Sequence, residues 1–271
     1  MRHCSKEISG AFAVKKINSL VLTKSIFMKL ICLTFLLSLS FMVNAQNNFK
    51  ATQIKFERVK KAYGEKWETL EKFIRTDGFG DQFSMVINAY KSEGKLEVWL
   101  KANTDKNYKL FRTYDFCAHS GTLGPKVIEG DGQTPEGFYY INVFNPMSNF
   151  HLSLGVNYPN SVDKARTGKD RKTGGDIYIH GNCVTIGCIP LTDEKIKEVY
   201  ILGVEARNAG QENIPVNIYP FKMTDGNLNK YSAQFPAQAG FWKSLQPGYL
   251  AFEKNKNQAK VSEVKGNYVV K

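Results

Sequence analysis

The sequence predicts an α+β, β-rich protein, in which a β-sandwich or mixed-sheet core carries helices at its N- and C-terminal ends. Short runs of β-type residues fill the middle of the 271-residue chain, separated by Gly, Pro, Asp and Asn clusters. Apolar residues spaced three and four apart lie before and after these runs and indicate amphipathic helices. Strands and helices do not alternate regularly, which argues against a doubly wound parallel sheet.

The first 45 residues are expected to be absent from the mature protein. Met28-Lys29 opens a second start, followed by the apolar run Leu30–Val43 and a small-residue site ending at Ala45. This order is that of a secretory signal peptide, and the run is shorter than the roughly 20 residues of a membrane span. We therefore expect an upstream extension over 1–27, a signal peptide over 28–45, a periplasmic location and no stable membrane insertion.

The remaining 226 residues are enough for one domain with a substantial core. Loss of six Lys or Arg and one Glu lowers the net charge from +12 to +7. That charge suits an acidic wall polymer or serves ordinary solubility, and no basic-aromatic motif points to nucleic acid. We divide this part into an N-terminal helical segment (46–82), a central domain (83–222) and a C-terminal helical and hairpin extension packed on it (223–271).

The N-terminal segment is predicted to be helical from Lys50 to Ile74. Its helical spacing is carried by Val59, Ala62, Tyr63, Trp67, Leu70 and Ile74. Gly64 is a candidate point of division into two helices, and Asp77-Gly78 ends the segment.

Strands are predicted in the central domain at Phe83–Tyr90, Leu96–Lys101, Lys109–Cys117, Gly137–Phe144, His151–Tyr158, Asp176–His180 and Ile214–Tyr219. Ser92-Glu93-Gly94 is typical of a hairpin turn between the first two. Asp163 and Arg166 are placed in a polar loop, as a solvated surface pair.

A further helix is expected to begin after Thr192, a good N-cap, and to bury one face through Ile196, Val199, Tyr200 and Val204. Near the C-terminus, a helix from Gly240 to Leu245 is expected to stop near Pro247-Gly248 and to resume as far as Lys254. Val261–Val264 and Tyr268–Val270, around Gly266-Asn267, predict a small hairpin.

The stretch from His180 to Cys188 carries the chemistry. Alternation in Asp176–His180 places Tyr178 and His180 on one face of a strand, with Ile177 and Ile179 toward the core. A nearby imidazole can take the proton of a thiol and make it a nucleophile. Gly187 before Cys188 permits a turn tight enough to aim two N–H groups at one oxygen. The pattern predicts a cysteine acyl-transfer site.

The cysteine count supports a free thiol. Cys117, Cys183 and Cys188 follow the expected cleavage site, an odd number for an exported protein, which indicates one free thiol beside one disulfide. If Cys188 is the nucleophile, Cys117 and Cys183 are the available pair. The alternatives are a local Cys183–Cys188 disulfide, a zinc site built on His180 and both cysteines, and an inert buried Cys188.

Several stretches in a fixed order resemble one enzyme family, and the likeness runs from about Phe73 to the C-terminus. The matching stretches are HGNCVTIGC (180–188), SGTLGPK (120–126), GDGQTPEGFY (130–139) and IYPFKMTD (218–225). The chain thus resembles the L,D-transpeptidases with a YkuD-type catalytic domain, in particular the compact YafK-like branch. The resemblance implies a YkuD-like core over 83–222 and a role in remodelling peptidoglycan.

For the site, the resemblance implies that Cys188 is the nucleophile and His180 the general base. The thiolate would attack the amide carbonyl at the L-centre of meso-diaminopimelate and form a thioester. The N–H groups of Gly187 and Cys188 would hold the oxyanion, and a backbone carbonyl near Gly181 would orient the imidazole. The acceptor is a second diaminopimelate amine, a lipoprotein lysine or water, the last making the enzyme a hydrolase. No cofactor or metal is implied.

The sequence departs from the broad family pattern at three positions. Thr185 replaces a Ser whose hydroxyl it can mimic, Ile186 replaces a His or Arg, and Pro190 replaces an Arg. A different mode of carboxylate binding is therefore expected. Ser120, Lys126 and Tyr178 are candidate contacts for an anionic peptide stem, although 120–126 equally suits a plain turn. A non-catalytic wall-binding module is the alternative from another class.

Overall fold

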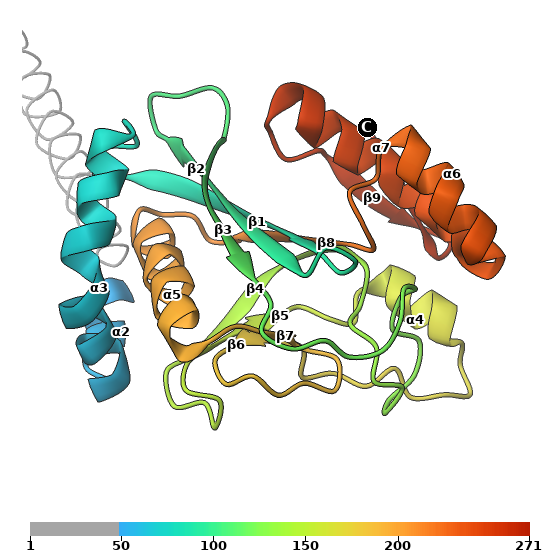
Figure 1. Cartoon of the computed structure of the whole chain (residues 1–271), viewed down its shortest axis with the longest axis horizontal. Helices are drawn as coiled ribbons and strands as arrows, with labels where there is room; N and C mark the ends of the chain where they lie inside the picture. Colours follow the sequence, from blue (N-terminus) through green and yellow to red (C-terminus); the bar gives the residue numbers. More distant parts are fainter. Residues whose placement is uncertain (1–48) are drawn as a thin grey trace, which may run out of the picture. The chain divides into compact units, whose positions relative to one another are not determined.

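The computed structural model describes residues 49–271, which form one compact unit (Figure 1). The predicted upstream extension (1–27) and signal peptide (28–45) lie outside the described residues. Within the described range, no helix combines the length and apolarity needed to cross a bilayer.

The centre of the fold is a mixed eight-stranded sheet. Its strands are β1 (Phe83–Tyr90), β2 (Lys95–Ala102), β3 (Lys109–Asp115), β4 (Gly137–Asn145), β5 (Ser153–Val156), β6 (Tyr178–His180), β7 (Ile189–Pro190) and β8 (Pro215–Tyr219). The spatial order is β3-β2-β1-β8-β4-β5-β6-β7. Only the β1–β8 and β6–β7 pairs are parallel. The α+β class with a mixed-sheet core is therefore confirmed, and β1 and β2 form the expected hairpin.

Three helices lie together on one side of this sheet (Figure 1). They are α2 (Phe49–Ile54), α3 (Glu57–Thr76) and α5 (Asp193–Asn208). The helix break falls at Lys55-Phe56, and Gly64 lies inside α3, where one glycine costs about 1 kcal/mol and is tolerated. Because α5 contacts α2 and α3 as well as the strands, it is buried on more than the predicted face, including Ile201 and Leu202.

The C-terminal part packs against another region of the sheet and consists of α6 (Asp225–Gln234), α7 (Ala239–Asn255) and the hairpin β9 (Val261–Val264) and β10 (Asn267–Val270). Its buried cluster joins Trp242 and Tyr249 to Tyr90 and Tyr219 of the sheet. The predicted stop at Pro247-Gly248 is wrong, because α7 continues through both residues. A Cβ at Gly248 would lie 2.4 Å from the Phe138 ring, so glycine permits the close packing there.

One helix, α4 (Ser161–Thr167), replaces the predicted polar loop. Asn160 Oδ1 accepts from the Val162 and Asp163 N–H groups, and Asp163 Oδ2 accepts from the Asn160 N–H, which completes a capping box. The expected surface pair is wrong: Asp163 is fully buried, and the half-buried Arg166 lies over the Phe241 ring. Helix α6 was also not predicted.

The buried Asp163 predicts a pH-dependent stability. Burial raises its pKa from 3.8 to about 7, while an N–H of Asn160 and the Tyr139 hydroxyl oppose the rise. The folded state therefore binds the proton more tightly than the unfolded state. This tighter proton binding contributes to the free energy of unfolding, and the contribution is complete below about pH 4. It is lost as the pH rises toward 7, by up to about 4 kcal/mol. Asp163→Asn should flatten this dependence in denaturant titrations from pH 4 to 8.

The exposed Asp170 provides the matched control. Asp170→Asn should leave the wild-type pH dependence unchanged. Equal slopes for wild type and Asp163→Asn would contradict the assignment.

Candidate active site

The segment between β6 and β7 brings together most of the residues that the sequence predicted. The two strands pair in parallel, with Ile179 opposite Ile189 and His180 opposite Pro190. Continued by one residue, this register places Cys188 beside Tyr178. Neighbouring residues in register share a face of the sheet, so Cys188 and His180 lie on the same face, offset by two residues, about 7 Å along the strand.

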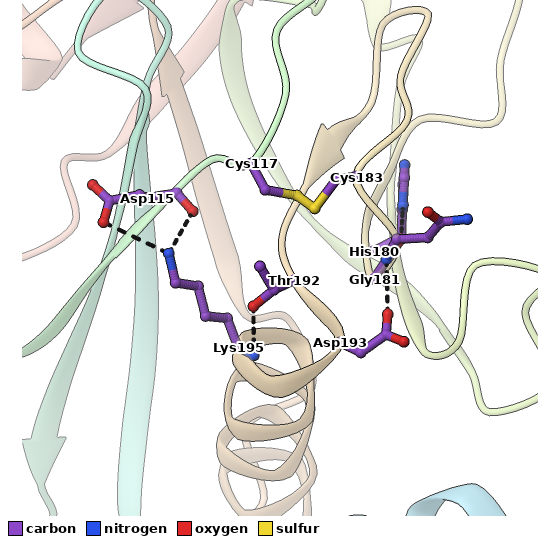
Figure 2. The surroundings of a disulfide bond; sticks show 9 residues. Asp115, Cys117, His180, Gly181, Cys183, Thr192, Asp193 and Lys195 are labelled. Atoms are coloured by element: carbon purple, nitrogen blue, oxygen red, sulfur yellow. Dashed lines mark hydrogen bonds and ion pairs between the residues drawn. A yellow bond between two sulfur atoms is a disulfide. The ribbon is translucent and has the colours of Figure 1, made fainter.

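The turn after His180 is held by the first turn of α5. Asn182 has a positive φ of 64°, and its N–H donates to Asp193 Oδ1 at 2.9 Å. A Cβ at Gly181 would lie 2.6 Å from the same carboxylate oxygen. Figure 2 shows Asp193 beneath this turn, next to Thr192, which caps α5. Glycine at 181 is therefore required by close approach of the helix.

The turn before Cys188 is equally constrained. Gly187 has a φ of 137°, and a Cβ there would lie 2.8 Å from the Gln133 carbonyl oxygen. Thr185 Oγ1 donates to the Cys188 carbonyl at 2.8 Å and accepts from the Gly187 N–H at 3.1 Å. Thr185 thus braces the turn as the usual serine would. The Gly187 N–H, predicted to face an oxyanion, is bonded to Thr185 in this structure.

His180 is buried and its tautomer is defined by the backbone. Its Nδ1 lies 2.5 Å from the Gly181 carbonyl oxygen, an acceptor, so Nδ1 carries the proton and Nε2 is left with its lone pair. The predicted orienting carbonyl near Gly181 is thus the Gly181 carbonyl itself. Burial lowers the pKa of His180, and the Gly181 hydrogen bond partly opposes this. The imidazole is therefore neutral near pH 7.

Cys188 is a free, half-buried thiol. Its Sγ lies 3.5 Å from the Asp176 carbonyl oxygen. Burial raises the pKa of this thiol, the Tyr178 backbone N–H opposes the rise, and the Asp176 and Lys126 charges act in opposite directions. Both groups are therefore uncharged at rest near pH 7. Such a pair can transfer a proton at the moment of attack.

Cys117 and Cys183 form a disulfide, the pair predicted for a free Cys188 (Figure 2). The Cys117 N–H also donates to the Pro190 carbonyl at 3.1 Å, so the chain leaving β3 runs beside β7. These two links connect opposite ends of the strand order next to Cys188. The zinc alternative and the local Cys183–Cys188 disulfide both require Cys183 as a free partner, and the observed disulfide leaves neither available.

A cavity of about 190 Å³ opens beside Cys188. Its polar lining includes Lys91, Ser92, His119, Ser120, Thr122 and Thr134. Ser120 therefore lies at the site, although its Oγ donates to the Gly132 carbonyl at 2.6 Å and also supports the loop. Tyr178 is partly buried next to Cys188.

Lys126 has a mainly structural role. It is buried, and its Nζ lies 2.7 Å from Asp131 Oδ1 and 3.0 Å from the Ile128 carbonyl oxygen. Asp131 also accepts N–H groups of Val127, Ile128 and Gln133. The ammonium is thereby occupied, and its influence on Cys188 is electrostatic.

One lining residue of the cavity, Lys91, belongs to a buried ion pair. Lys91 Nζ donates to Glu136 Oε1 at 2.9 Å and to the Gly124 and Thr134 carbonyls. Glu136, fully buried, accepts the Trp242 indole N–H at 2.8 Å through its other oxygen. Buried charges need such full pairing. Helix α7 of the C-terminal extension thus helps to shape the cavity.

Comparison with known sequences agrees with this geometry. The family profile of the L,D-transpeptidase catalytic domain (YkuD) matches residues 84–218, which span β1 to β8. The YafK protein of Escherichia coli strain K12, which carries the L,D-transpeptidase family name, is 37% identical over 186 residues, covering 68% of this chain and 72% of YafK. The chain belongs to the L,D-transpeptidase family.

Comparison with solved structures gives matches at low sequence identity. The helical cell shape determining protein Pgp2 of Campylobacter jejuni is 17% identical with a TM-score of 0.41, covering 72% of this chain and 80% of Pgp2. Bd1075 of Bdellovibrio bacteriovorus is 19% identical with a TM-score of 0.37, covering 67% of this chain and 78% of Bd1075.

Within this family member, the tertiary structure adds residues that the sequence reasoning missed. Asp193 is the first residue of α5, and its carboxylate holds the turn after His180. The Phe150 ring packs on the His180 ring, with centroids 4.7 Å apart and an interplanar angle of 33°. Lys91, Glu136 and Trp242 come from distant segments. Of these residues, only Asp193, 13 residues after His180, is close enough in the sequence to have suggested a contact with the site.

The disulfide is expected to stabilise the fold of this L,D-transpeptidase-family chain. It joins residues 66 positions apart, and loop-closure entropy then gives about 2–4 kcal/mol. Cys117→Ser/Cys183→Ser should lower the free energy of unfolding by that amount in denaturant titrations. Cys188→Ser, the control, should leave it nearly unchanged. Wild-type stability of the double variant, or peptide mapping that joins Cys183 to Cys188, would contradict the assignment.

Proposed function

We propose that this chain is a periplasmic, cysteine-dependent L,D-transpeptidase-like enzyme that acts on peptidoglycan peptide stems through a Cys188 thioester. The observation that carries the proposal is the free Cys188 thiol on the same face as His180, whose Nδ1 is fixed by the Gly181 carbonyl. Family membership supports the reaction class.

In the proposed acylation, His180 Nε2 takes the thiol proton as Cys188 Sγ attacks the amide carbonyl at the L-centre of meso-diaminopimelate. A C–S bond forms and the carbonyl oxygen becomes an oxyanion. When the tetrahedral intermediate collapses, the C–N bond breaks and the imidazolium returns the proton to the leaving amine. The thioester then passes to an acceptor amine or to water, with His180 acting again as base.

The oxyanion is assigned to the backbone at Cys188. The Cys188 N–H follows the turn braced by Thr185, whereas the Gly187 N–H can contribute only if it leaves Thr185 Oγ1. A single oxyanion donor contributes roughly 3 kcal/mol in other enzymes. The bracing by Thr185 would then control how many donors the intermediate receives.

The cavity beside Cys188 is the proposed binding site for the reacting part of the stem. Ser92, His119, Ser120 and Thr122 line it with polar groups. The family arginine is replaced by Pro190, whose carbonyl bonds to Cys117. Recognition of the substrate carboxylate is therefore assigned to the polar groups of this cavity.

Export is proposed from the signal-type N-terminus and is supported by the Cys117–Cys183 disulfide. Disulfides persist in oxidising compartments and are rare in the cytosol. The net charge of +7 after signal removal suits an acidic wall polymer.

Muropeptide conversion tests the proposed reaction. Wild-type protein incubated with purified stems should give new products by mass spectrometry, and Cys188→Ala should abolish them because no thioester can form. Cross-linked dimers would identify an amine acceptor, and trimmed or released stems would identify water. Both products support the thioester. An intact thiol that gives neither product would contradict the proposal.

Alkylation separates an enzyme from a non-catalytic wall-binding module. Because burial raises the pKa of Cys188, labelling by iodoacetamide should increase with pH above the neutral range. His180→Ala should slow labelling at pH 7–8 by about 100-fold, as expected for loss of a general base. His119→Ala, an imidazole in the same cavity, is the control and should change the rate little. Equal rates for wild type and His180→Ala would favour the module.

A further inference from the structure

The loop between β4 and β5, residues 146–152, covers the proposed base. Phe150 in this loop packs on the His180 imidazole with centroids 4.7 Å apart, and 41% of Phe150 is exposed. The loop also contacts the catalytic segment directly, because the Gly181 N–H donates to the Leu152 carbonyl at 3.1 Å. Burial of His180 therefore depends on where this loop lies.

The loop contains a residue in an unfavourable backbone conformation. His151 adopts a positive φ of 67°, which is unfavourable for a residue other than glycine. His151 Nε2 is buried without a hydrogen-bond partner. Ser148, itself buried, accepts the Phe150 N–H through Oγ at 3.0 Å. Ser148 thus fixes the position of the Phe150 backbone.

An arginine on a helix distant in the sequence binds the backbone of this loop. Arg58, in the first turn of α3, donates Nη1 to the Ser148 carbonyl at 2.5 Å and to the His151 carbonyl at 2.8 Å. Charge-assisted hydrogen bonds of this kind are stronger than neutral ones. Contacts therefore run without a gap from Arg58 through Ser148 to Phe150 and the His180 ring.

We propose that Arg58 is a positioning residue for the general base: it anchors the 146–152 loop so that Phe150 holds and covers the His180 imidazole. The inference rests on the proposed role of His180. Arg58 lies outside residues 84–218, the part that matches the catalytic domain. The N-terminal helix is thereby assigned a part in catalysis besides packing on α5.

Loss of the Arg58 hydrogen bonds should affect His180 by giving water access to its ring. Without Arg58, the loop is released, Phe150 leaves the ring, and His180 becomes hydrated and free to rotate. Its pKa should rise toward 6.5, because burial is what lowers it. The charged or titratable groups around this assembly are Cys188 beside β7, Asp193, Glu194 and Lys197 of α5, His151, and Arg58 itself.

A double-mutant cycle tests the pathway. Arg58→Met and Phe150→Leu should each lower kcat about 10-fold with little change in KM, as expected for a displaced catalytic group. If Arg58 acts through Phe150, the double variant should also lose about 10-fold, whereas independent effects would give about 100-fold. Arg75→Met, on an exposed part of the same helix, is the control and should match wild type.

The pKa of His180, measured by NMR titration of its ring signals, gives a readout that does not need turnover. It should rise in Arg58→Met and in Ser148→Ala, which removes only the Oγ acceptor of the Phe150 N–H. An unchanged pKa in a folded Arg58→Met or Ser148→Ala variant, or an additive double variant, would overturn the inference. Absence of muropeptide products from wild type would instead count against the proposed function, and the titration would still decide whether Arg58 positions the ring.

Discussion

The parallel pairing of β6 with β7 is the constraint on which the candidate site depends. It sets Cys188 beside Tyr178 and on the face that carries His180. The connecting loop is short, so its two turns must be tight. Gly181 lies against Asp193, and Gly187 lies against the Gln133 carbonyl, with no room for a Cβ at either position. The backbone is therefore restrained at both turns, one on each side of the segment that joins His180 to Cys188.

Segments on both sides of the matched catalytic domain contribute to this arrangement. From the N-terminal side, Arg58 binds the loop that carries Phe150. From the C-terminal side, Trp242 donates to Glu136, and Glu136 pairs with Lys91 at the cavity beside Cys188. Loss of the Trp242 indole N–H would leave one oxygen of the fully buried Glu136 without its donor, at a cost of about 1–3 kcal/mol. The 84–218 region is therefore better regarded as the framework of the site than as the whole site.

Electrostatics favour a resting pair without charge. Burial acts on both partners in the direction of the neutral form, lowering the pKa of His180 and raising that of Cys188. A preformed thiolate-imidazolium pair would need nearby charges that stabilise both ionised groups. Among the described contacts of Cys188 and His180, this pocket does not provide them. In the proposed mechanism, proton transfer is then coupled to attack on the substrate. Phe150 contributes to this state because it covers the imidazole.

The sequence by itself indicated the β-rich class and seven strands of the main sheet to within a few residues, whereas β7 was not predicted. It also indicated Cys188 and His180 as the candidate pair, and Cys117–Cys183 as the disulfide available if Cys188 is free, because periodicity, glycine spacing and cysteine parity can be recognised without the fold. It failed at α4 and at Pro247-Gly248, where a buried Asp163 and the Phe138 ring outweigh local preference. Only the tertiary structure decided that Lys126 binds Asp131, and that Arg58, Phe150 and Trp242 support the site. The contacts of Arg58, Phe150 and Trp242 join residues far apart in the chain, and only packing specifies which of them meet.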